Sequence, residues 1–269
     1  MKAGRRYFWA GSGSFVVLAL CVPAPAAAPP YFDAFNAARK VEVNKLGVPA
    51  EALPALELEG LLALARAGED PQKWVPGLKT FSGVEAPKGT AAALKMVAQC
   101  WEARAQMIEW DKLLRAAYRK KARFPERLDD LLRSAPEALG KDPWGEAWAY
   151  RATAPAHSPN LVGQRYQLGP SRFPDLSPLE VLGKVSPLRP PAGVVFEFLS
   201  INPGDSAVKG GDAALVSLRV KDNRPSVAQS QRWSGAYQPG ERFGDYWVVW
   251  IQRGGVLLAH PDGLLAVPL

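Results

Sequence analysis

Few side chains in this sequence have the types and spacing that catalysis requires. The two histidines, His157 and His260, belong to no motif with a nucleophile or metal ligands, so both are interpreted as surface residues. Cys100 is expected to be the only cysteine of the mature chain, which excludes an internal disulfide and a cysteine-based metal site. Asp142 and Glu146 flank one turn and are the acids that a hydrolase, the least favoured of three hypotheses, would use. The sequence therefore predicts no catalytic residue, no metal and no cofactor.

The nine tryptophans offer a different chemistry, which is stacking on a sugar ring or on a peptide. Those in the predicted strands and turns are Trp144, Trp148, Trp233, Trp247 and Trp250. They are scattered between two predicted domains, and tryptophans in strands of alternating polarity mostly face a core. A secreted module that binds carbohydrate or peptide through exposed tryptophans is therefore kept as the alternative hypothesis.

The N-terminal segment predicts export from the cytoplasm. Lys2, Arg5 and Arg6 precede an apolar stretch over residues 15–28 that ends in small residues, which is the pattern of a secretory signal peptide. Cleavage is expected after Ala26, and an uncleaved membrane anchor is the open alternative. The protein is expected in the periplasm or cell envelope, with membrane contact only through this segment if it is uncleaved.

Length and composition favour two domains separated by proline-rich segments. Of the 269 residues, 48% are hydrophobic and 25 are prolines. The formal net charge is +7, but no stripe of Lys and Arg with interleaved aromatic residues indicates nucleic acid binding. The predicted segments are the signal peptide or anchor at 1–26, short helices and a linker at 31–87, a mixed module at 88–185, a proline-rich linker at 186–193 and a small β domain at 194–269.

The clearest helix is predicted over residues 89–121. Apolar residues recur at alternating spacings of four and three, which places them on one face: Met96, Cys100, Ala103, Met107, Trp110, Leu114 and Ala117. The opposite, polar side is predicted to carry Glu102, Arg104, Gln106, Glu109, Lys112 and Arg115. This pattern predicts a helix that buries one stripe in the core.

A short helix, a tight turn and a β-hairpin are predicted to follow. Pro125 suits the first position of a helix whose buried side is Leu128, Leu131 and Leu132. In the turn, Asp142 can cap, Pro143 fixes φ at the second position and Gly145 fits the fourth. The alternating segments 146–152 and 164–169 are predicted to pair as a hairpin.

Beyond the linker the pattern is that of strands. Short β-branched or aromatic runs between glycine-containing turns predict strands at 194–201, 213–220, 246–251, 255–260 and 264–269. Strands at this spacing predict a small sandwich or barrel. The fold class is therefore expected to be α+β.

Residues 95–175 resemble the C-terminal domain of the major pseudopilin of type II secretion systems. In that family a long helix leads into a turn and a short helix, and a Lys-Asp-Pro-Trp-Gly turn then leads into a strand with tyrosine. The matching positions are Arg123, Phe124, Pro125, Leu128, Leu131, Lys141, Asp142, Pro143, Trp144, Gly145, Trp148 and Tyr150. The resemblance implies a pilin-like long helix with a short helix and a hairpin, and it gives these motif residues a structural role.

The β segment, 194–269, is similar to the periplasmic β domains of inner-membrane secretion and pilus proteins. The matching positions are Gly240, Gly244, Tyr246, Val248, Ile251, Val256, Leu258, Leu265 and Val267. Together the two resemblances imply a non-enzymatic exported envelope protein, a structural or adaptor component related to type II secretion or type IV pilus machinery. Its expected partners are other envelope or secretion-system proteins.

The chain departs from pseudopilins in two places. It lacks the N-terminal "F-T-L-x-E" segment, whose glutamate governs fibre assembly in that family, so polymerisation is not expected. The family's calcium loop is replaced by residues 169–180, where Asp175 and Glu180 are the only carboxylates. Calcium ordinarily takes six or more oxygen ligands, so no calcium site is predicted, although one near Asp175 stays an open question.

Overall fold

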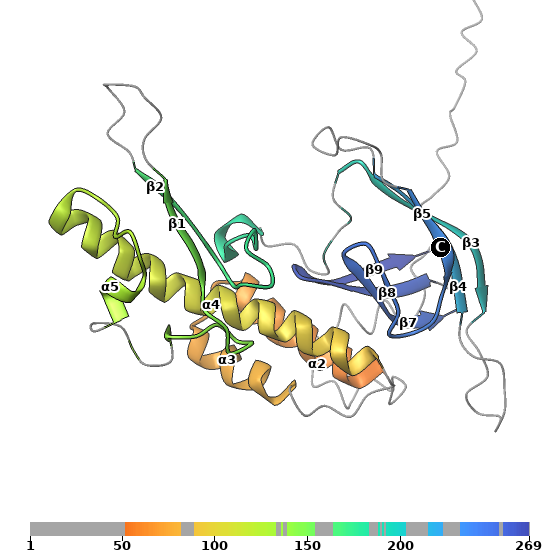
Figure 1. Cartoon of the computed structure of the whole chain (residues 1–269). Coiled ribbons are helices and arrows are strands. Elements are labelled where there is room, and N and C mark those ends of the chain that lie inside the picture. The colour runs from red at the N-terminus through yellow and green to blue at the C-terminus, as the bar shows by residue number, and fades with distance from the viewer. Residues whose placement is uncertain are drawn as a thin grey trace, which may run out of the picture.

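We describe the protein from a computed structural model (Figure 1). The described residues are 52–81, 89–132, 136, 139–153, 164–182, 188, 190, 192–202, 215–222, 232–252 and 255–268. The predicted export segment and His157 lie outside these ranges. Within the described part of the chain, no helix is both long and apolar enough to span a membrane.

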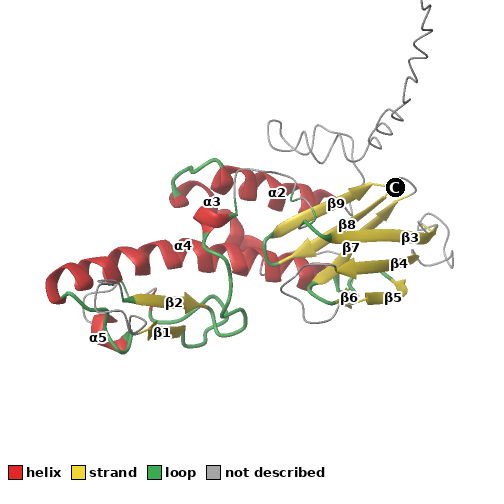
Figure 2. Ribbon diagram, turned by 90° about the horizontal axis from the view of Figure 1, so that it is seen from above, coloured by secondary structure: helices red, strands yellow, loops and turns green. Residues whose placement is uncertain are grey.

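The centre of the fold is the helix α4, Thr90–Lys121, which confirms the long helix expected from the sequence. Two further helices, α2 (Leu53–Arg66) and α3 (Pro71–Thr80), pack against one side of it (Figure 2). Asp70 caps α3 by accepting a hydrogen bond from the backbone N–H of Gln72 at 3.0 Å. Leu58, Leu62 and Trp74 are fully buried, so the short helices expected before residue 87 form part of the core.

Most of the apolar stripe of α4 is buried as predicted, with Met96 and Ala117 half-buried, but a neighbouring side of the helix is buried as well. Cys100 and Trp110 of the predicted stripe are fully buried, and so are Trp101 and Arg104 beside them. Arg104 was expected on the polar side, and that expectation is wrong. The physical reason is that α4 contacts α2, α3, β2, β7 and β8, so more than one stripe is covered.

The predicted hairpin is confirmed: β1 (Ala149–Thr153) pairs antiparallel with β2 (Arg165–Gly169), with Tyr150 opposite Leu168. It lies beside the C-terminal half of α4, on the side away from α2 and α3 (Figures 1 and 2). The short helix α5 is only Asp129–Leu132, so its predicted start at Pro125 is wrong.

The reason for the late start of α5 lies in the hydrogen bonds of this segment. The carbonyl of Pro125 accepts a hydrogen bond from the Tyr150 hydroxyl at 2.8 Å. The N–H of Leu131 reaches only three residues back, to Leu128. This geometry leaves Leu132 37% exposed, whereas it was expected on the buried side of the helix.

Two antiparallel sheets make up the C-terminal part, which establishes the α+β class. The first contains β3 (Val194–Asn202), β4 (Leu215–Asp222) and β5 (Arg232–Tyr237). The second contains β6 (Arg242–Phe243), β7 (Tyr246–Gln252), β8 (Gly255–His260) and β9 (Gly263–Pro268). The two sheets enclose a shared core that includes Val216, Leu218, Val248 and Leu258. Five of these strands were predicted, and β5 and β6 were not.

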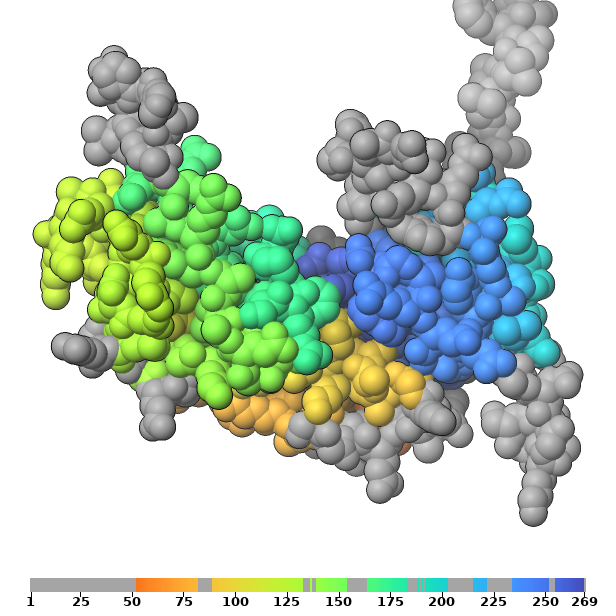
Figure 3. Space-filling view, viewed as in Figure 1, coloured from red at the N-terminus to blue at the C-terminus, as the bar shows by residue number. Residues whose placement is uncertain are grey.

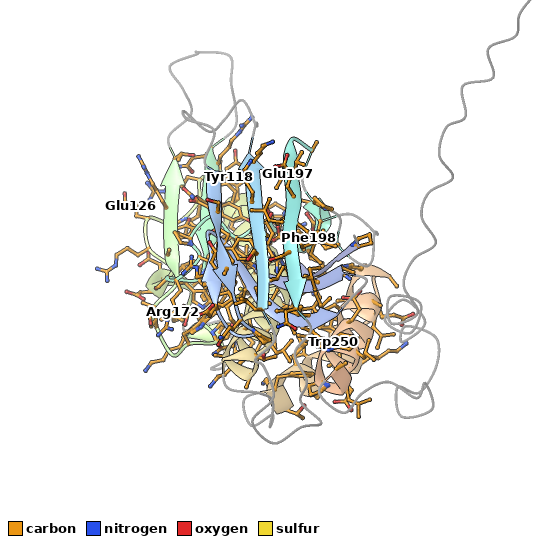
Figure 4. The ribbon with its side chains drawn as sticks, turned by 90° about the vertical axis from the view of Figure 1, so that its right-hand side faces the viewer. Tyr118, Glu126, Arg172, Glu197, Phe198 and Trp250 are labelled. Carbon is orange, nitrogen blue, oxygen red and sulfur yellow. The ribbon has the colours of Figure 1, made fainter. Side chains whose placement is uncertain are left out.

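The second sheet also packs on the helices. Val249, Leu257 and Leu264 belong to the same hydrophobic cluster as the buried residues of α2 and α4. Figure 4 places Trp250 where this sheet meets the pale orange helices. One hydrophobic cluster therefore joins the helices to one face of the second sheet, while the other face of that sheet belongs to the core between the two sheets.

Candidate binding groove of tryptophan and basic side chains

The turn at residues 142–145 is a rigid corner. The N–H of Gly145 donates to the carbonyl of Asp142 at 2.8 Å, and Gly145 adopts a φ of 80°, which favours glycine. One carboxylate oxygen of the buried Asp142 accepts from the N–H groups of Trp144 and Glu146, at 3.0 and 2.9 Å. The other accepts from the N–H of Ser171 at 3.1 Å. Asp142 therefore stabilises the corner through three backbone groups, as the turn pattern predicted.

Other motif residues connect the hairpin to α4 and to the segment that follows it. The indole N–H of the buried Trp148 donates to the carbonyl of Leu139 at 3.0 Å. The ring of Phe124 lies between those of Tyr118 and Tyr166, with centroid distances of 4.7 and 4.9 Å. Burial raises the pKa of the Tyr150 phenol, whose hydroxyl donates to Pro125. Arg123 and Lys141, by contrast, are exposed.

Trp144 lines a groove that was not predicted from the sequence. Its ring lies 5.6 Å from that of Phe173, and the side-chain amide of Gln99 donates to the carbonyl of the neighbouring Pro143 at 3.0 Å. The groove has a volume of about 780 Å³ and runs between three parts of the chain. We call it the Trp144–Trp247 groove, and its lining residues are Ala92, Lys95, Met96, Gln99, Pro143, Trp144, Arg172, Phe173, Arg242 and Trp247.

Each wall of the groove comes from a different element. The first half of α4 forms the floor, because Ala92, Met96 and Gln99 recur at helical spacing. The 142–145 turn and the turn after β2 form one wall, and the β6–β7 hairpin forms the other. Figure 3 shows the gold surface of α4 between the green lobe and the blue lobe. The sheet and the hairpin must therefore both pack on α4 for the groove to exist.

The charge of the groove is positive. Lys95, Arg172 and Arg242 line it, and its described lining contains no carboxylate. Arg172 pairs with Glu146 at 3.1 Å, and Figure 4 places it at the edge of the molecule below the pale green hairpin. The Arg172 side chain is 57% exposed and that of Arg242 is 55% exposed. Both guanidinium groups can therefore still donate to a ligand.

The guanidinium of Arg242 is held over a tryptophan. It lies 4.6 Å from the centre of the Trp247 ring, and the two residues face each other across β6 and β7. Its Nε donates to the carbonyl of Gly244 at 2.6 Å, and its Nη2 is 3.6 Å from a carboxylate oxygen of Asp245. Stacking and the backbone contact restrict the side chain, which lowers the entropy lost when it contacts a ligand.

The lining suits binding better than catalysis. Among the described lining side chains, only the Lys95 amine is of a type that can act as a nucleophile or as a general acid or base, because imidazole, thiol, hydroxyl and carboxylate groups are absent. They supply cationic donors from Lys95, Arg172 and Arg242, together with flat apolar rings. The arrangement can therefore hold an anion next to an apolar group.

A second arginine site has a fully buried arginine at its centre. Arg104 is fully buried; its Nε donates to the carbonyl of Ser177 at 2.9 Å, its Nη1 to that of Pro261 at 2.8 Å, and its Nη2 to the carboxylate of Asp262. Burial lowers the pKa of Arg104, and the Asp262 carboxylate acts in the opposite direction. Arg104 therefore ties α4 to the segment after β2 and to the β8–β9 turn.

A second buried arginine completes this site. Arg66 pairs with the buried Glu59 at 2.7 Å. The guanidinium groups of Arg66 and Arg104 lie 5.0 and 5.1 Å from the ring centre of Trp101. We call Glu59, Arg66, Trp101, Arg104 and Asp262 the buried arginine cluster.

The other candidate residues from the sequence belong neither to the Trp144–Trp247 groove nor to the buried arginine cluster. His260, interpreted from the sequence as a surface residue, is half-buried: its ring lies 5.0 Å from that of Tyr246, and its Nδ1 accepts from the N–H of Asp262 at 3.1 Å. Cys100 is buried, and burial raises the pKa of its thiol to about 12. Asp175 is exposed and accepts from the amide of Gln167 at 2.6 Å. No group of three His, Cys, Asp or Glu in the described ranges could hold a metal ion.

Comparison of the chain with family models, with curated proteins and with solved structures finds no match. The similarity to pseudopilins therefore depends on the motif residues of this chain alone.

Proposed function

We propose that this protein is a non-enzymatic, exported envelope protein that acts as a structural or adaptor component of machinery related to type II secretion or type IV pili. In this proposal the long helix, the short helix and the hairpin form a pilin-like module, and the β part is joined to it through the hydrophobic cluster that the second sheet forms with α2 and α4. The partner protein is bound in the Trp144–Trp247 groove.

The observation that carries the proposal is the composition of the groove. It gathers three basic side chains and three aromatic rings from segments at 92–99, 143–144, 172–173 and 242–247. Aromatic and arginine side chains are the types enriched at protein interfaces. More than half of the lining residues come from the turns of the pseudopilin-like region and from the β6–β7 hairpin. A bound partner would therefore contact both the pseudopilin-like region and the β part.

The proposal is tested by crosslinking in the cells that produce the protein. A photo-crosslinking amino acid is placed at Lys95 in the groove and, as a control, at Lys120 near the far end of α4. We expect position 95 to yield a crosslink to an envelope component of secretion or pilus machinery. Crosslinks at position 120 only, or only to proteins unrelated to such machinery, would contradict the proposal.

A second candidate function has its own supporting observation. Trp144 and Trp247 are both half-buried and both line the groove, so either ring could stack on a sugar. In that case the protein is a secreted carbohydrate-binding module. A change of tryptophan fluorescence on titration with neutral glycans, lost in Trp247→Leu, is the result that this alternative requires.

A further inference from the structure

The hydrogen-bonding groups of the Trp144–Trp247 groove are almost all donors. Lys95, Arg172 and Arg242 have donors and no acceptor, and an indole N–H is also a donor only. Among the described lining side chains, the one strong acceptor is the amide oxygen of Gln99, whose NH2 group donates to the Pro143 carbonyl. The groove therefore matches a ligand that is rich in acceptors.

The excess of hydrogen-bond donors over acceptors favours an anionic ligand over a neutral sugar. A neutral sugar brings a hydroxyl that is donor and acceptor at once, and its donors would find few side-chain acceptors in this lining. A carboxylate is an acceptor only, and it forms its strongest hydrogen bonds with guanidinium and ammonium groups. The positive charge also attracts an anionic ligand at long range. An anionic ligand is favoured over a neutral sugar.

The apolar part of the lining adds a second requirement. Met96, Trp144, Phe173 and Trp247 contribute large, flexible or flat apolar surfaces beside the basic groups. An acidic polysaccharide presents carboxylates but few apolar groups. A peptide can present Asp or Glu next to Leu, Ile or Phe, and so satisfies both kinds of surface.

We propose that the Trp144–Trp247 groove binds an acidic peptide segment of a partner protein, with carboxylates on Lys95, Arg172 and Arg242 and an apolar side chain between Trp144 and Trp247. This assignment rests on the proposed function, because it specifies the partner that the adaptor holds. It requires the basic groups and the aromatic rings together.

A selection experiment tests the assignment and does not require that the partner be identified first. A random dodecapeptide phage library is selected on the purified full-length protein. The groove variant Lys95→Gln/Arg242→Gln and the matched variant Arg119→Gln/Lys120→Gln are selected in parallel. The matched variant loses the same charge at the far end of α4, on residues outside the groove. We expect selection on the wild type and on the matched variant to yield peptides that combine acidic and apolar residues. Selection on the groove variant should not yield such peptides.

The selected peptide is then compared with two other probes. Its Asn/Gln counterpart should bind at least about tenfold more weakly, because charge-assisted hydrogen bonds are about twice as strong as neutral ones. Affinity should fall as NaCl rises from about 50 mM to about 500 mM. Polygalacturonate, an acidic glycan without apolar side chains, should compete poorly. Recovery of neutral or basic peptides, equal selection by the groove variant, or preference for polygalacturonate overturns the assignment.

The outcomes also separate this inference from the proposed function. If crosslinks from position 95 reach secretion or pilus components but no acidic peptide is selected, the adaptor function stands and the peptide assignment fails. If acidic peptides are selected but no such crosslinks form, the groove is a peptide-binding site and the link to secretion machinery fails.

Discussion

In the part of the chain that the structure describes, arginine stacks on tryptophan in two places whose surroundings differ. In the buried arginine cluster, Arg104 lies 5.1 Å from the ring centre of Trp101. In the groove, Arg242 lies 4.6 Å from that of Trp247. The side chain of Arg104 is 0% exposed, whereas that of Arg242 is 55% exposed.

The difference shows how solvent access decides what such a pair does. All three guanidinium nitrogens of Arg104 donate to oxygens of the protein, and the Arg104 side chain is fully buried although that of Asp262 is 28% exposed, so loss of Arg104 leaves the carbonyls of Ser177 and Pro261 without their donor. Arg242 donates to one carbonyl and keeps N–H groups in contact with water. We conclude that the first pair stabilises the fold and that the second is available for a ligand.

The largest effect is expected from Arg104→Met. It removes the donor from the carbonyls of Ser177 and Pro261, so the free energy of unfolding should fall by about 3–5 kcal/mol. The matched change Arg242→Met also removes an arginine from a tryptophan ring, but at an exposed site it should cost about 0.5 kcal/mol or less. Urea unfolding curves of both variants provide the measurement. Similar losses in the two variants would refute the distinction between the sites.

A smaller effect is expected at the glycine beside the buried arginine cluster. Gly263 has a φ of 137°, and a Cβ there would collide with the Arg66 guanidinium. Gly145 also has a positive φ, of 80°, but nothing within 4 Å of an added Cβ. Gly263→Ala should therefore cost about 2–3 kcal/mol and Gly145→Ala about 1 kcal/mol, the latter from backbone strain alone. Thermal unfolding of the two proteins provides the comparison, and equal losses would show that the Arg66 side chain moves aside without a measurable cost.

Alkaline pH provides a third test, which is whether water reaches the buried thiol of Cys100. Burial raises the pKa of Cys100 from 9.0 to about 12, while the nearby Arg104 acts to lower it and Asp262 to raise it. The unfolded state therefore releases the thiol proton first, and stability is lost as pH rises between these two values. At about pH 10.5 the loss from this group is about 2 kcal/mol.

The control is Cys100→Ala, which lacks the thiol. Unfolding measured at neutral pH and at about pH 10.5 should show a smaller decrease in the variant than in the wild type. The same decrease in both proteins would mean that the thiol ionises freely in the folded state and that water reaches this part of the core.

Local patterns predicted much of the fold. The alternating stripe on α4, the Asp142 turn and the β1–β2 hairpin depend on residues that are near each other in sequence, and all three were predicted. Strand β5 was missed because Gly235 interrupts its pattern, and β6 because it has only two residues. The start of α5 was wrong because Tyr150, from a distant segment, uses the Pro125 carbonyl.

The two arginine sites could not be predicted, because their parts are far apart in the chain. Arg104 contacts Ser177 at a separation of 73 residues and Pro261 at 157, so helical periodicity alone placed it on the polar side. The groove joins the DPWG turn, interpreted from sequence as purely structural, to Trp247 in the predicted β domain. One local signal was available: Trp101 and Arg104 are three residues apart, so they lie on the same face of α4.

The central claim is that the Trp144–Trp247 groove binds a ligand, whereas the buried arginine cluster stabilises the fold. The most direct test is the affinity of the variant Lys95→Gln/Arg242→Gln for the selected acidic peptide. It is measured by titration on protein whose unfolding curve is also recorded. We predict affinity at least about tenfold below wild type, with the free energy of unfolding within about 0.5 kcal/mol of wild type. Wild-type affinity in this variant, with its fold intact, would contradict the account.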